Sequence, residues 1–112
     1  MNNSNLENAS DLYVPGTLGE IYDLLGSMVL SAPTFTDPSF PNRDLNNRFL
    51  QLTLGFDAVR TKIGEDHYNV LTNLSLRAKV LFEHDQNDSN GKTDEGRTIL
   101  FQIEELIGKL LI

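Results

Sequence analysis

The sequence has no cysteine, which excludes disulfides, thiolate metal ligands and cysteine nucleophiles. No apolar run approaches the roughly 20 residues that a helix needs to cross a bilayer. The first residues, MNNSNLENASDL, have neither the basic start nor the apolar centre of a secretory signal. These absences predict a cytoplasmic protein that does not span a membrane.

Basic side chains are scarce, since nine Lys and Arg stand against 16 Asp and Glu for a formal net charge of −7. Proteins that bind nucleic acid or anionic lipid use clustered Lys and Arg, so both partners are disfavoured. A basic protein partner is compatible with this charge, because opposite fields speed encounter. The acid could equally serve solubility alone.

Motifs that carry known chemistry are also missing. The two histidines, His67 and His84, lie at opposite ends of one expected helix, and no Glu-x-x-His pair occurs. The turn after His84 resembles a calcium loop, but Gln86 takes the first ligand position and Arg97 takes the twelfth, where a glutamate is required. No phosphate-binding glycine loop or nucleophile turn is present. We therefore predict no catalytic residue, no cofactor and no metal site.

The clearest pattern in the chain is an apolar stripe between Asp44 and Ile63. Its members recur at alternating steps of four and three residues, as on one face of a helix. They are Leu45, Phe49, Leu52, Phe56, Val59 and Ile63. Gly64 is expected to end this helix, and the link to the next is so short that the two must form an antiparallel hairpin.

Three further helices are expected around this one. Thr17 and Glu20 form a capping box that begins a helix running to about Ser31. A helix from about residue 65 to 84 has the apolar face Tyr68, Leu71, Leu74, Ala78, Leu81 and Phe82. Thr93 or Asp94 begins the last helix, whose face is Ile99, Ile103, Leu106, Ile107 and Leu110.

Without strand signals, this pattern predicts an all-α fold, an up-and-down four-helix bundle formed by residues 15–112. Residues 1–14, rich in Asn, Ser and Glu, are expected to be a flexible N-terminal arm. The proline-rich connection between the first two helices contains Phe35 and Phe40, which we expect to pin it across the bundle.

A second apolar group lies away from the main stripes of the central hairpin. Leu50 and Leu54 come from its first helix, and Leu76 and Val80 from its second. Folding about Gly64 and Glu65 predicts that Leu54 lies level with Leu76, and Leu50 with Val80. Three interpretations remain open: the N-terminal arm or the Phe35–Phe40 connection covers the group, a homodimer buries it, or a different protein does.

Acidic side chains gather at one end of the expected bundle, around the turn between the last two helices. They are Glu83, Asp85, Asp88, Asp94 and Glu95. Because acid at a helix start is also favoured by the helix dipole, only part of this cluster indicates a partner.

Six residues separate Arg60 from His67, a spacing that resembles the one found in helical-bundle ribonucleases of the HEPN type. The resemblance implies an RNA-cleaving bundle that uses these two residues. Against it, Gly64 interrupts the helix between them, the surroundings are acidic, and Asp57 or Glu65 offers Arg60 a simpler partner.

Taken together, the sequence favours a non-catalytic protein–protein interaction module, such as an inhibitor, an immunity-type protein or an adaptor. The apolar group would supply buried contact, and the acidic end would steer a basic partner. The alternative is a homo-oligomeric structural bundle without a second protein, and an HEPN-like ribonuclease is the remote third.

Overall fold

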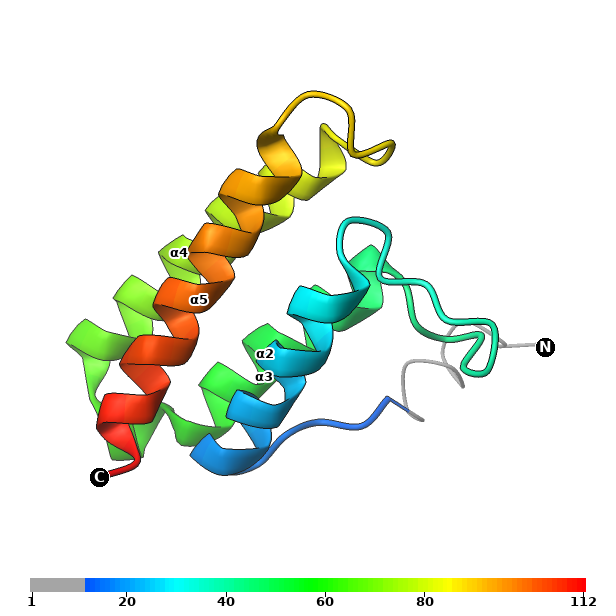
Figure 1. Cartoon of the computed structure of the whole chain (residues 1–112). Helices are drawn as coiled ribbons and strands as arrows, with labels where there is room; N and C mark the ends of the chain where they lie inside the picture. Colours follow the sequence, from blue (N-terminus) through cyan, green and yellow to red (C-terminus); the bar gives the residue numbers. More distant parts are fainter. Residues whose placement is uncertain (1–11) are drawn as a thin grey trace, which may run out of the picture.

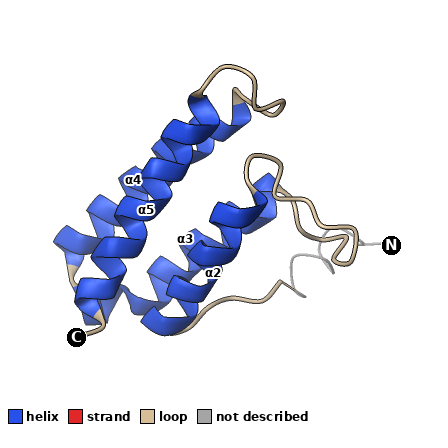
Figure 2. Cartoon of the chain, viewed as in Figure 1, coloured by secondary structure: helices blue, strands red, loops and turns tan. Residues whose placement is uncertain are grey.

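The computed structural model describes residues 12–112, which form four helices (Figures 1 and 2). They are α2 (Leu18–Ser31), α3 (Leu45–Ile63), α4 (Glu65–Glu83) and α5 (Lys92–Leu110). No strand occurs within the described residues. The predicted all-α fold is confirmed, whereas the expected flexible arm lies largely outside the described part of the chain.

The helices alternate in direction, as Figure 1 shows, and each packs against the next. The ring closes because α2 also packs against α5, so that the chain is an up-and-down four-helix bundle. One apolar core receives side chains from all four helices.

The stripe predicted for α3 faces this core. Phe49, Leu52, Phe56, Val59 and Ile63 are buried, and Leu45 is partly buried against them. On α5 the buried face is wider than expected, because it also includes Thr93, Gly96 and Leu100. A glycine is required at position 96 for a steric reason, because a Cβ atom there would lie 2.6 Å from the ring of Phe82 on α4.

The helix ends follow the predicted chemistry. Thr17 caps α2, with its Oγ1 accepting a hydrogen bond from the Glu20 amide at 3.1 Å. Asp44 caps α3 in the same way through the Asn47 amide at 2.8 Å. Gly64 adopts a φ of 87° and is the only residue between α3 and α4, so the chain reverses at one position. On α5, the first residue is Lys92, slightly earlier than expected.

The connection from α2 to α3 is pinned by one of its two phenylalanines. Phe35 is buried, with its ring edge-on to Phe82 at 5.0 Å and to Phe49 at 5.6 Å between centroids. Phe40 instead remains half exposed, with the Arg43 guanidinium 4.0 Å above its ring. The prediction is therefore confirmed for Phe35 and wrong for Phe40.

Candidate interaction surface

An open apolar groove of about 660 Å³ runs between α4 and α5. Leu76 and Val80 line it from α4, and Ile99 lines it from α5. Leu76 and Val80 are 54% and 48% exposed, although both are large apolar side chains. α4 and α5 are antiparallel neighbours, and the groove lies between residues 76–81 of α4 and residues 95–102 of α5, about two turns of each helix.

A smaller depression of about 320 Å³ lies on the other side of α4, against α3. Leu50 and Leu76 both line it, so Leu76 contributes to both hollows. Leu54 is partly buried and lines neither. The structure thus brings together Leu50, Leu76 and Val80 across α3 and α4 and leaves Leu54 apart from them.

The hairpin folds about Gly64 alone, because α3 ends at Ile63 and α4 begins at Glu65. Folding about this residue puts Leu50 level with a point on α4 midway between Leu76 and Val80, about half a helical turn from the predicted pairing. Leu50 lines one depression together with Leu76. The exact pairing of heights stays a prediction.

Within residues 12–112, the α2–α3 connection does not cover this surface. Phe35 points into the core, while Phe40 lines a different depression with Leu12 and Tyr13. Covering by this connection is therefore excluded, and covering by residues 1–11 lies outside the described part of the chain. Burial in a homodimer or against another protein stays a prediction.

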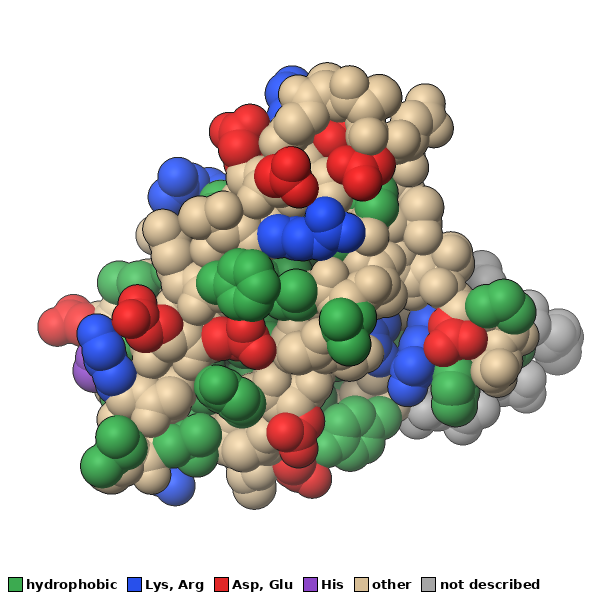
Figure 3. Space-filling model, in the orientation of Figure 1, with side chains coloured by type: hydrophobic (Ala, Val, Ile, Leu, Met, Phe, Trp, Pro, Cys, Tyr) green, Lys and Arg blue, Asp and Glu red, His purple; other side chains and the backbone are tan. Residues whose placement is uncertain are grey.

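The acidic end is visible in Figure 3, where acidic side chains gather at the end of the bundle formed by the α4–α5 turn. Glu83, Asp88, Asp94 and Glu95 are exposed. Asp94 makes an ion pair with Arg97 at 3.4 Å. Glu95 also lines the α4–α5 groove, which connects the acidic end to the apolar surface.

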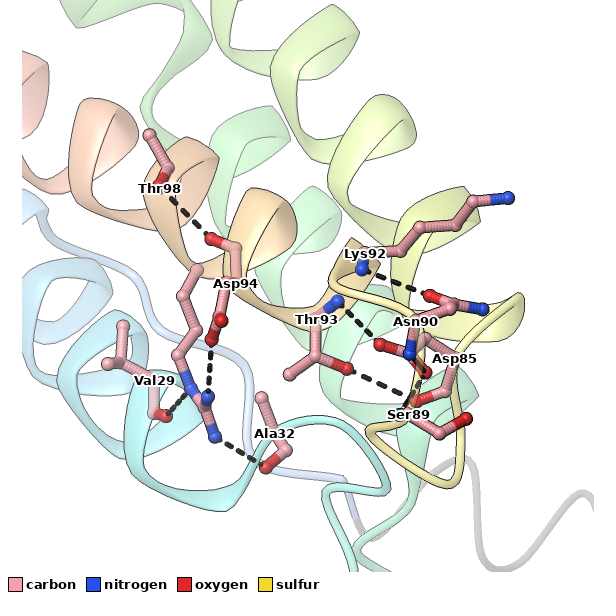
Figure 4. Close-up of polar contacts among 10 residues, drawn as sticks. Val29, Ala32, Asp85, Ser89, Asn90, Lys92, Thr93, Asp94 and Thr98 are labelled. Atoms are coloured by element: carbon pink, nitrogen blue, oxygen red, sulfur yellow. Dashed lines mark hydrogen bonds and ion pairs between the residues drawn. The ribbon is translucent and has the colours of Figure 1, made fainter.

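Asp85 departs from the expectation of a surface acid, because it is only 3% exposed. Its Oδ1 accepts hydrogen bonds from the amides of Ser89 at 2.7 Å and Asn90 at 3.2 Å. Its Oδ2 accepts from the Thr93 amide in the first turn of α5 at 2.9 Å (Figure 4). The carboxylate therefore organises the turn and caps α5, and it is not presented to a partner.

The hydrogen bonds also decide the protonation of Asp85. Desolvation by itself would raise the pKa of this carboxyl group. The hydrogen bonds from Ser89, Thr93 and Asn90 outweigh it and hold the pKa below its usual value. Asp85 is thus an ionised structural group.

Arg97, at the failed calcium-ligand position, has a structural partner on α2. Its guanidinium donates to the carbonyl oxygens of Val29 at 3.3 Å and Ala32 at 3.1 Å. These acceptors lie at the C-terminal end of α2, whose last turn has no basic residue of its own. Within residues 12–112, no group of three or more His, Asp or Glu side chains is placed to hold a metal ion.

Arg60 and His67 are each occupied by local contacts. Arg60 forms a bidentate pair with Glu65 at 2.7 and 2.8 Å and lies over the ring of Tyr68. His67 Nδ1 lies 3.0 Å from the carbonyl oxygen of Ile63. The simpler partner expected for Arg60, Glu65, is the one observed.

Sequence reasoning missed two features, one on the surface and one in the interior. One is a set of exposed apolar side chains on α2 and α5, with Leu30 at 86% and Phe101 at 54% exposure. The other is Arg48, which is 5% exposed although it carries a charge. Arg48 lies one residue before Phe49 of the core stripe, a position that helical spacing alone places at the edge of the core.

Comparison with protein-family models, with curated proteins and with solved structures finds no match to this chain. In the described part of the chain, no helix has the length and apolar character needed to cross a membrane.

Proposed function

We propose that this chain is a non-catalytic protein–protein interaction module, an inhibitor, immunity-type protein or adaptor. The α4–α5 groove is the observation that carries the proposal. It combines exposed Leu76 and Val80 with a volume of about 660 Å³. Large apolar side chains lining an open hollow are typical of contact surfaces.

The occupant that fits this groove is an amphipathic helix of a second protein. Two antiparallel helices form its walls, so a third helix can lie along it with apolar side chains at helical spacing. Glu95 at the rim and the exposed acids Glu83, Asp88 and Asp94 favour a partner helix with Lys or Arg at the corresponding end. We expect the two proteins to meet in the cytoplasm.

The test is partner capture with the full chain and three variants. Leu76→Asp and Val80→Asp place a charge in the groove, and Leu30→Asp is the matched control because Leu30 is an exposed leucine on α2. We expect a partner that binds wild type and Leu30→Asp and is lost from both groove variants. A partner that binds all four proteins equally, or no partner at all, would contradict the proposal.

Self-association is the alternative use of the same surface. Light scattering over a range of concentrations separates the two functions. A dimer that is lost in Leu76→Asp and retained in Leu30→Asp would replace the hetero-partner by a second copy of this chain. A monomer at every concentration would remove that alternative.

The HEPN-like ribonuclease has less support. The Arg60 guanidinium already has two hydrogen bonds to Glu65, and a substrate phosphate would have to displace that carboxylate. RNA cleavage by the wild-type chain that disappears in His67→Ala would revive this alternative.

A further inference from the structure

Arg48 is a buried cation with incomplete hydrogen bonding. It projects from α3, where Nη1 donates to Gln51 Oε1 at 3.1 Å and Nη2 donates to Ser27 Oγ on α2 at 2.9 Å. Both acceptors are neutral, and the buried Nε has no hydrogen-bond partner among the described residues. A buried charge is normally paired, because leaving water costs several kcal/mol.

No carboxylate of residues 12–112 lies within 4.0 Å of Arg48. Glu20 and Asp23 line a neighbouring depression together with both Arg43 and Arg48, but they do not pair with Arg48 at this distance. Burial lowers the pKa of Arg48, and the charge of Arg43 lowers it further. Both influences act against a cation that nevertheless stays charged, since arginine does not lose its proton in proteins.

Arg43 and Arg48 line the same depression of about 320 Å³ between α3 and the α2–α3 connection. Asn42 adds an amide, while Leu12, Tyr13 and Phe40 supply an apolar wall. Arg43 lies over the half-exposed ring of Phe40, and its ion pair with Asp37 is long, at 3.6 Å. Two guanidinium groups and an aromatic surface thus converge on one hollow of a chain whose net charge is −7.

We propose that this depression binds the carboxylate of a small organic acid, with the carboxylate between Arg43 and Arg48 and the apolar part of the ligand against Phe40. A guanidinium matches the planar carboxylate in geometry and charge. The hollow is at the small end of ligand sites, which are about 300–1,000 Å³. The nearby acids Glu20 and Asp23 disfavour a doubly charged phosphate. This site is built from Leu12 and Tyr13 before α2, from the α2–α3 connection and from α3, so it is separate from the α4–α5 groove.

The test is an NMR titration of the ¹⁵N-labelled full chain, with the Nε–Hε resonance of Arg48 as the readout. This resonance is assigned by comparison with Arg48→Met, in whose spectrum it is absent. The probes are phenylacetate, its neutral analogue phenylacetamide, and inorganic phosphate. We expect phenylacetate alone to shift the resonance saturably. Arg43→Gln should weaken that binding about tenfold, as expected for one charge-assisted hydrogen bond. Arg77→Gln, an exposed arginine of α4, should leave it unchanged.

Three results would overturn the proposal. One is the absence of a saturable shift at about 10 mM phenylacetate, ten times a 1 mM dissociation constant. The second is an equal response to phenylacetamide or a stronger one to phosphate. The third is a shift of the unliganded resonance in Glu7→Gln/Asp11→Asn, since the chain's own carboxylates would then pair with Arg48.

Discussion

Asp85 and Arg48 are both buried charged side chains, but they differ in how their polar atoms are satisfied. Asp85 accepts three backbone amide hydrogen bonds, two from its own turn and one from the first turn of α5. Arg48 has two neutral acceptors and a buried Nε without a partner. A fully bonded buried charge stabilises the fold and offers nothing to a ligand, whereas an incompletely bonded one retains binding capacity. The comparison therefore gives Asp85 a structural role in the α4–α5 turn and is the basis of the ligand site proposed at Arg48.

The largest loss of stability is expected for Asp85→Ala. The change leaves the amides of Ser89, Asn90 and Thr93 without their acceptor and uncaps α5. Urea unfolding followed by circular dichroism should show a clear fall in the midpoint. Glu83→Ala removes an exposed acid at the same end and should leave the midpoint unchanged or slightly raised, because acid is unfavourable at a helix C-terminus. Equal effects of the two variants would remove the distinction between buried and surface acid.

The charge of Asp85 gives a second, pH-dependent contrast. Its pKa is lowered in the folded chain, so its ionised form contributes stability above the unfolded value of 3.8, and that contribution is lost as the pH falls through the lowered folded value. Asp85→Asn should be less stable than wild type at about pH 6, and the difference should shrink towards about pH 3. Urea unfolding curves of both proteins between these two pH values measure the difference in stability. A difference that is constant with pH would show that the charge of Asp85 is unimportant.

Arg97→Met should have a smaller effect than Asp85→Ala. It removes two charge-assisted hydrogen bonds to the carbonyl oxygens of Val29 and Ala32 at the C-terminal end of α2, at a cost of about 1–2 kcal/mol. Arg77→Met is the matched control, since Arg77 is an exposed residue of α4. Chemical denaturation of both variants tests this, and a loss below about 0.5 kcal/mol for Arg97→Met would mean that the contact contributes little.

Helical periodicity was sufficient for the fold and for part of the candidate site. Six apolar residues of α3 at steps of four and three define a core face, and Thr17 with Glu20 defines the start of α2. Such local patterns are read from spacing alone. The height of Leu50 relative to α4 depends on how tightly one residue, Gly64, turns the chain, which spacing does not specify.

The burial of the two charged side chains, Asp85 and Arg48, was not predicted from the sequence for a different reason. Asp85 looks like any acid in a polar turn until its carboxylate is seen to accept amides from up to eight residues later. Arg48 is buried because it lies between α2 and α3 and bonds to Ser27, 21 positions away along the chain. Tertiary packing produces both arrangements, and no sequence motif predicts them.

The smallest change in stability is expected for Arg48→Met, although Arg48 is buried. Its removal costs hydrogen bonds to Gln51 and Ser27, but it also relieves the desolvation of an unpaired cation. These contributions oppose each other, so the free energy of unfolding should change by no more than about 1 kcal/mol in either direction. Urea unfolding of Arg48→Met and wild type measures this change in free energy, and phenylacetate binding is the second readout. If Arg48→Met lost more than about 3 kcal/mol, Arg48 would be a structural bridge between α2 and α3, and its contrast with Asp85 would vanish.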